Sequence, residues 1–410
     1  MLSSIILKTI FYIVSFLISV ISARMVSIAD IGSFAILFSI CNILIIIFGF
    51  GLDTTIIKIF SSNVKSLEYE FDTIIGDRII LQIILSPLIF LILYLYSDNL
   101  MLSLMATLIV FCVLIRNMIS NLFLAKRNII KGLFLQEGIQ SITRFSILLS
   151  VFIFLIIIQK ENIYNINILY IAWLVGVLLS FIISVFIYTI NNFESYNIKG
   201  AVIRLFCLIK DSKNFWLSQI IWLTIPYIDI LIISKILNYT DVAGYDTAAK
   251  IAAAGVFFSS VTQSVIAPKI SNIWNGGKIE ELLQYLKKVS VIFVMLSLIS
   301  FLFFYTLGTQ ILLIWGSDFV PYYEVLLIVA LSQLLKMTFG PLSSLLQMSG
   351  YSNLELRVAL LNLPIKVITS IVLGIYFGVI GIAISVLIST LLSNTVLFAY
   401  SKKILRLKVS

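Results

Sequence analysis

Long apolar runs determine what this chain can fold into. The 410-residue sequence contains about twelve of them, and each is long enough to cross a bilayer as a helix of about 20 mostly apolar residues. A membrane β-barrel would instead show short segments of alternating polarity. The sequence therefore predicts an all-α polytopic membrane protein. The predicted spans are 4–25, 32–56, 77–97, 100–123, 138–158, 166–190, 214–234, 242–267, 286–307, 321–347, 355–377 and 379–400.

The composition excludes several classes of active site. Only 11% of the residues are charged and 61% are hydrophobic, whereas about a quarter of a soluble domain is charged. The sequence contains no histidine, which removes the commonest proton shuttle and metal ligand. Cys41, Cys112 and Cys207 lack metal-type spacing, and we expect no disulfide framework. No phosphate-binding glycine loop is present either, so we expect no metal, no cofactor and no ATP hydrolysis by that route.

Basic residues concentrate in alternate loops, and this pattern predicts the orientation. The largest hydrophilic loops, at about 57–76, 191–213 and 268–285, all fall on the side that carries most of the lysines and arginines outside the spans, together with the 124–137 loop and the C-terminal tail. The positive-inside rule then places these loops and both termini in the cytoplasm. The opposite loops are very short, which leaves no room for an extracytoplasmic catalytic domain. We therefore expect a protein that is not an enzyme.

An internal repeat predicts two lobes. Ser22 and Ser234 are 212 positions apart, and so are Gly32 and Gly244. Six spans in each half make both halves enter the membrane from the same side, as in transporters built from parallel repeats. We predict lobes at 1–200 and 201–410, each with six helices.

Several cations lie inside the predicted spans. Lys250, Lys336 and Lys366 are the deepest of them, and Arg144 and Arg24 lie nearer span ends. Because a buried charge is costly, such residues usually face a cavity or a partner. A cavity lined by cations would attract an anion, especially phosphate or diphosphate.

Each of these residues also has a structural interpretation. Lys250 can form an i,i+4 pair with Asp246, and Arg24 can simply fix a helix end. Lys8, Lys58 and Arg78 are expected to reach the membrane interface with their long side chains.

Three acidic residues in or near the spans are candidates for ion coupling. They are Asp229, Asp53 and Asp246, which could bind a proton or a sodium ion. For Asp53 the structural alternative is again a role in fixing a helix end.

The order and spacing of short motifs resemble those of the MOP exporter superfamily, specifically its Wzx-type flippases of lipid-linked oligosaccharides. The resemblance covers essentially the whole chain. The motifs are Ala23-Arg24, Gly32-Ser33-Phe34-Ala35, Gly51-Leu52-Asp53 with Lys58, Asp229, Gly244-Tyr245 with Ala248 and Lys250, Pro268-Lys269-Ile270-Ser271, Gly276-Gly277, Trp315-Gly316-Ser317-Asp318-Phe319 and Gln347-Met348-Ser349-Gly350.

This resemblance implies two six-helix lobes that form a V around a central cationic cavity, in the bacterial cytoplasmic (inner) membrane. It implies a substrate of undecaprenyl diphosphate that carries a short sugar repeat for O-antigen, capsule or lipopolysaccharide assembly. Lys250 matches the position of a basic cavity residue in related lipid flippases. Expected partners are this lipid-linked oligosaccharide, membrane lipids, and the polysaccharide polymerase and chain-length proteins of the same pathway, with no nucleic acid.

Two alternatives remain open. A cation-coupled multidrug exporter of the same superfamily shares the fold, but it would favour an acidic cavity. A membrane glycan polymerase would need a sizeable extracytoplasmic loop with catalytic residues, whereas the outer loops here are short.

Overall fold

A computed structural model describes residues 2–61, 71–126, 128–158, 165–192, 201–256, 266, 269–274, 276–349 and 351–409. Every regular element in these residues is a helix, and they contain no β-strand. The prediction of an all-α fold is therefore confirmed.

The helices have the length and the surface of membrane spans. Ten of those in the described residues are long and apolar enough to cross a bilayer. Large apolar side chains point outwards from them; Leu95 is 72% exposed and Ile157 is 73% exposed. A helix satisfies all of its interior backbone hydrogen bonds within one segment, which lipid requires. The chain is thus a multi-pass membrane protein.

The last helix accounts for two of the predicted spans. Helix α15 (Ser352–Val409) breaks at Gly378, where φ is 61° and ψ is −143°. The break lies between the predicted spans 355–377 and 379–400, so α15 has two arms that can each cross the membrane. The predicted span 242–267 begins in α10 (Tyr239–Gly255) and continues into residues 257–265, which lie outside the described part.

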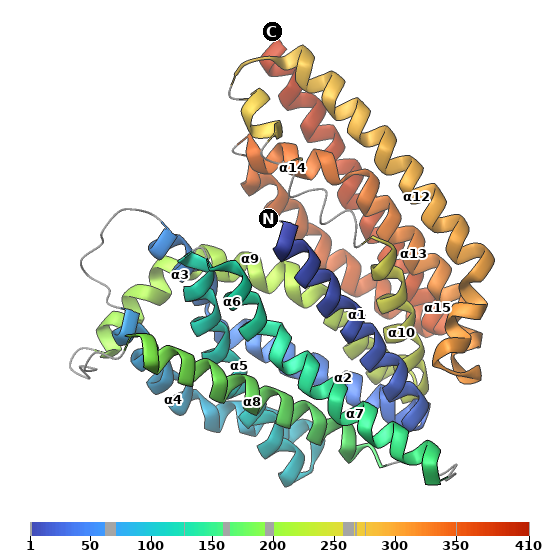
Figure 1. Ribbon diagram of the computed structural model, residues 1–410. Helices are drawn as coiled ribbons and strands as arrows, with labels where there is room; N and C mark the ends of the chain where they lie inside the picture. The colour runs from blue at the N-terminus through green and yellow to red at the C-terminus, as the bar shows by residue number, and fades with distance from the viewer. Residues whose placement is uncertain are drawn as a thin grey trace. The chain divides into compact units, whose positions relative to one another are not determined.

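The chain forms two compact units, Met1–Tyr227 and Ile228–Ser410. Helix α5 (Leu100–Ala125) is central to the first unit, because it packs against α2, α3, α4, α6 and α8 (Figure 1). The remaining elements of this unit are α1 (Leu2–Met25), α2 (Ile28–Gly49), α3 (Leu52–Ser61), α4 (Phe71–Ser97), α6 (Ile129–Leu133), the π-helical turn η1 (Phe134–Gly138), α7 (Ile139–Ile158) and α8 (Asn167–Asn192). The start of α9 (Ala201–Ile236) also belongs to it.

The second unit is built around α13 (Tyr323–Thr338), which packs against α10, α12 and α15. It also contains the end of α9. Its other elements are α12 (Ile279–Trp315), the 3₁₀ turn η2 (Ser317–Tyr322) and α14 (Gly340–Met348). Figure 1 shows the long α12 running beside α13 and α15.

Helices α2 and α10 each begin with a side-chain cap. Ser27 caps α2, because its hydroxyl accepts a hydrogen bond from the Asp30 amide at 3.2 Å. At the start of α10 the Asp241 carboxylate accepts a hydrogen bond from the Asn238 amide at 3.5 Å. Side-chain acceptors at these positions satisfy amides that lack a partner inside the helix. The two contacts differ in direction: at α2 the N-cap side chain accepts, whereas at α10 the side chain three residues later accepts.

Two motif glycines allow close packing. Gly51 has a φ of +66°, and a Cβ at this position would lie 2.6 Å from the backbone nitrogen of Trp216 in α9. A Cβ on Gly244 would lie 2.4 Å from the ring of Tyr322. Gly51 therefore packs the α2–α3 turn against α9 in the first unit, and Gly244 packs α10 against η2 in the second.

Candidate functional site

A buried ion pair connects α9 to the first arm of α15. Lys366 Nζ lies 2.8 Å from Asp229 Oδ2, and each side chain is only 4% exposed. The hydroxyl of Tyr245 in α10 donates a hydrogen bond to the same carboxylate oxygen at 3.0 Å. Because burial removes both charged groups from water, the attraction between them must offset the cost of their lost hydration. The pair fixes three helices of the second unit to one another.

The second carboxylate oxygen of Asp229 remains available to bind a ligand. Asp229 Oδ1 is buried and accepts no hydrogen bond from the described residues. A carboxylate oxygen in that state can accept a proton or coordinate a cation. The sequence predicts anion binding by Lys366 and ion coupling by Asp229, and the structure brings the two side chains together.

The second ion pair lies on α10 and is open on one side. Lys250 Nζ lies 2.5 Å from Asp246 Oδ2 at i,i+4 spacing. The Asp246 residue is buried, whereas the Lys250 side chain is 51% exposed. This is the structural pair that the spacing allows, and the exposed ammonium can still meet a ligand. The pair thus places one accessible cation beside a buried carboxylate.

Lys336 lies in the last turn of α13 and its side chain is exposed. The charge of Lys336 is repelled by the charge of Lys366 and attracted by that of Glu355. The second unit therefore places Lys336 and Lys366 within electrostatic range of each other. Lys336 is exposed, whereas Lys366 is buried. Asp229 and Glu355 offset part of this positive charge.

In the first unit the predicted cations occupy different surroundings. The guanidinium of Arg144 lies over the ring of Phe34, 5.0 Å from its centroid, as a cation–π contact between α7 and α2. Arg24 is exposed in the last turn of α1. Asp53 in α3 is hydrogen-bonded to Asn121, and it lies within electrostatic range of Arg78 and Arg116.

The expectation for Arg78 is wrong. The structure buries this side chain completely instead of extending it to the interface. All three of its nitrogens are buried, and none donates a hydrogen bond to a described residue. Arg78 lies near Asp53, so the attraction of this carboxylate holds the guanidinium inside the unit rather than at its surface.

Two further buried charged groups were not predicted from the sequence. Arg116 is buried in α5, where it donates hydrogen bonds to Gln140 and, at 3.0 Å, to Asn117. Asp77 is buried and binds Arg204 through two hydrogen bonds of 2.8 Å each. The arginine inside the apolar run 100–123 was the available signal for the first of these. The Asp77–Arg204 pair joins residues 127 positions apart, and no local pattern indicates it.

With this geometry established, comparison with known proteins identifies the family. The model of a family described as polysaccharide biosynthesis proteins matches residues 1–274, which is more than half of the chain. This chain belongs to that family. Among curated proteins, this member of the polysaccharide biosynthesis family is 26% identical over 195 residues to a probable low-salt glycan biosynthesis flippase, Agl15, of Haloferax volcanii. That match spans 47% of this chain and 41% of the relative.

Solved structures share the fold of this polysaccharide biosynthesis family member over nearly its whole length. An inward-facing multidrug resistance MATE transporter of the MOP superfamily has a TM-score of 0.76 at 13% identity, with 97% of this chain and 95% of that chain covered. The lipid II flippase MurJ, in an inward closed conformation, has a TM-score of 0.74 at 17% identity, with coverage of 98% and 88%. These similarities show a polytopic membrane fold of the MATE and MurJ type.

Proposed function

We propose that this member of the polysaccharide biosynthesis family is a flippase for undecaprenyl-diphosphate-linked oligosaccharide repeat units. It would move them across the bacterial cytoplasmic membrane by alternating access through a cationic cavity. The family match supports a role in polysaccharide synthesis. The partial match to a protein described as a glycan biosynthesis flippase and the fold shared with MurJ support a lipid-linked substrate. The polymer would be the O-antigen of lipopolysaccharide, capsule or another surface polymer, made together with a polymerase and chain-length proteins.

The observation that carries the proposal is the exposure of Lys250 and Lys336 on helices that are otherwise apolar. Exposed ammonium groups in such positions suit a substrate with a diphosphate. In this mechanism Lys250 and Lys336 hold the phosphates electrostatically. Lys366 is neutralised by Asp229 and becomes available to the substrate only when that pair opens. Arg144 and Arg24 are the further cations that the sequence offers for the site.

Asp229 is the acidic residue that best fits ion coupling in this scheme. Its unpartnered Oδ1 can take up a proton, which would weaken the attraction of Lys366 and free a cation for the substrate. Asp53 and Asp246 are the other two candidates. Each of them already faces a cation, Arg78 and Lys250 respectively.

The fold shared with a multidrug resistance MATE transporter favours a second candidate, a cation-coupled drug exporter. Such a protein carries cationic drugs best in an acidic site. The exposed lysines of the second unit argue for an anionic substrate instead.

The test uses a strain that lacks this gene and is complemented with variants. Lys250→Gln with Lys336→Gln removes both exposed cations, and Lys287→Gln with Lys288→Gln, two exposed lysines of α12, is the matched control. We expect the first pair to accumulate diphosphate-linked repeat units in the inner leaflet and to lose surface polymer, whereas the control restores the polymer. Surface polymer that is normal in both strains would refute the cationic site. Single repeat units that reach the surface unpolymerised would indicate a polymerase, and new drug sensitivity alone would indicate the exporter.

A further inference from the structure

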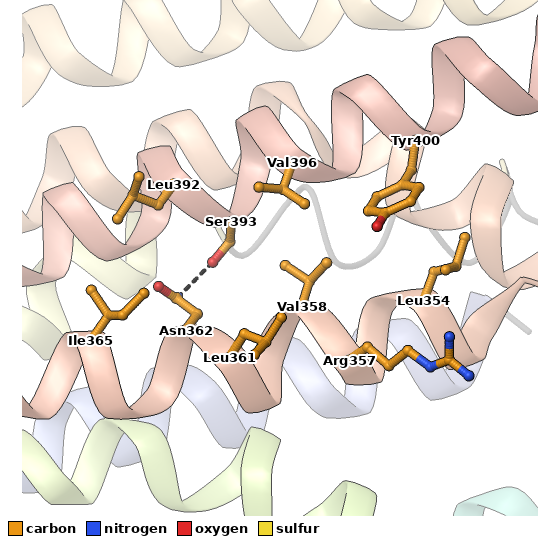
Figure 2. Close-up of a pocket in the computed structure, with 10 residues that line it drawn as sticks. All are labelled: Leu354, Arg357, Val358, Leu361, Asn362, Ile365, Leu392, Ser393, Val396 and Tyr400. Carbon is orange, nitrogen blue, oxygen red and sulfur yellow. Dashed lines mark hydrogen bonds between the residues drawn. The ribbon is translucent and has the colours of Figure 1, made fainter.

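The two arms of α15 enclose a groove that the proposed transport site does not use (Figure 2). Its volume is about 350 Å³. The walls are formed by one face of each arm, and both faces are mainly aliphatic. The lining residues are Leu354, Arg357, Val358, Leu361, Asn362 and Ile365 on the first arm, and Leu392, Ser393, Val396 and Tyr400 on the second.

A polar contact connects the two arms at the base of the groove, at the level of Asn362. The Asn362 amide nitrogen donates to the Ser393 hydroxyl at 2.6 Å, to the Ser389 hydroxyl at 2.9 Å and to the Ser389 carbonyl at 3.1 Å. In Figure 2 this contact bridges the two arms. Hydrogen bonds between helices fix their separation in an apolar medium. The groove is therefore a built feature of the α15 hairpin.

One end of the groove is polar. Arg357 and Tyr400 lie there, and Figure 2 shows the Tyr400 hydroxyl directed into the space between the arms. Arg357 is exposed and forms no ion pair with any residue that the structure describes. The lining contains no acidic residue. A guanidinium and a phenol at the same end of a groove can each donate a hydrogen bond to a phosphate group.

The groove thus has a cationic end that continues into an apolar trough, which is the chemistry of an amphiphile with a phosphate. Exposed Leu361, Ile365 and Leu392 line the trough beyond Val396. The second arm carries Lys402 and Lys403, both exposed, just beyond Tyr400. Lysines and arginines at the ends of spans attract anionic lipids.

We infer that this groove binds one anionic phospholipid of the bilayer. Arg357 and Tyr400 hold its phosphate, and one acyl chain lies along Leu361, Ile365 and Leu392. A single cation in the lining matches the single charge of a phosphate diester. A diphosphate would call for a second cation. The volume lies at the small end of ligand pockets, which fits one chain of hydrocarbon.

Native mass spectrometry of the purified protein tests this inference independently of transport. The protein is titrated with phosphatidylglycerol or with phosphatidylcholine, and bound lipid is counted. Arg357→Gln removes the cation, and Lys287→Gln, on α12 outside the groove, is its control. Val396→Trp fills the trough, and Leu360→Trp, on the exposed outer side of the first arm, is the control for bulk.

The wild-type protein is expected to retain one phosphatidylglycerol in preference to phosphatidylcholine. Arg357→Gln should weaken that binding by about tenfold and abolish the preference, since a hydrogen bond to a charged group contributes about that much. Val396→Trp should lose the lipid, while both controls keep it. Equal retention of the two lipids, unchanged in Arg357→Gln, would overturn the inference. So would undecaprenyl phosphate displacing phosphatidylglycerol from the groove, because that result would assign it to the substrate.

Discussion

Lys366 and Asp229 neutralise each other inside the second unit, 2.8 Å apart, although 137 positions separate them in the sequence. Their contact holds the first arm of α15 against α9, and the hydroxyl of Tyr245 adds α10 to the same carboxylate. Because both charges are withdrawn from water, this contact has consequences for stability as well as for the proposed transport.

Breaking the pair should destabilise the protein more than removing it. Lys366→Met and Asp229→Leu each leave one buried charge without its partner, which costs about 3–5 kcal/mol of unfolding free energy. The double variant Lys366→Met with Asp229→Leu replaces the pair by apolar side chains and should be close to the wild type. Thermal unfolding of the purified variants in detergent measures this coupling. Additive losses in the double variant would show that the two charges act independently.

Substitutions of Asp246 and Lys250 should change the apparent affinity for the diphosphate lipid in opposite directions. Asp246→Asn leaves Lys250 as an uncompensated exposed cation, so the apparent affinity for the diphosphate lipid should rise by a few fold. Lys250→Gln should lower it by a similar factor, since a half-exposed pair contributes at most about 1 kcal/mol. Transport of a fluorescent lipid-linked oligosaccharide into vesicles, measured over a range of substrate concentrations, reports both values.

Salt provides the control for this second prediction. Raising the ionic strength screens exposed charges, so it should reduce the difference between Asp246→Asn and the wild type. If both substitutions shifted the affinity in the same direction, they would be acting through the structure of α10 and not through the charge of Lys250.

Gly51 should tolerate substitution poorly. In Gly51→Ala the new methyl group would lie 2.6 Å from the backbone of Trp216, at a φ of +66°. The left-handed conformation alone costs a non-glycine residue about 1–2 kcal/mol. Gly277 provides the matched control, because its φ is +70° and a Cβ added there would have no atom within 4 Å. Gly51→Ala should therefore lower the melting temperature by more than Gly277→Ala does; equal shifts would mean that α9 yields at Trp216.

The sequence predicts features that depend on local pattern. Apolar runs gave the helices, and the boundary between the last two predicted spans falls at Gly378, where the backbone leaves the helical region. The pairing of Lys366 with Asp229 depends on how α9 packs against α15, and spacing within one helix carries no information about it. Arg78 shows the same limit, because its distance from a span end predicted exposure while the packing of α4 in the first unit buries it.

Arg78 and Arg116, two buried arginines of the first unit, should respond differently to replacement by methionine. Arg78 donates no hydrogen bond to a described residue, so its burial carries a desolvation cost with only the attraction of Asp53 to offset it. Arg78→Met should leave the unfolding free energy nearly unchanged, because the lost attraction to Asp53 is offset by the removed cost of burying the guanidinium, and Asn121 and Arg116 still compensate Asp53. Arg116→Met removes the hydrogen bonds to Gln140 and Asn117 and should lower it by about 1–3 kcal/mol. Chemical unfolding of the two variants beside the wild type measures both changes. A clear loss of stability in Arg78→Met would instead mean that the attraction between Arg78 and Asp53 outweighs the cost of burying the guanidinium.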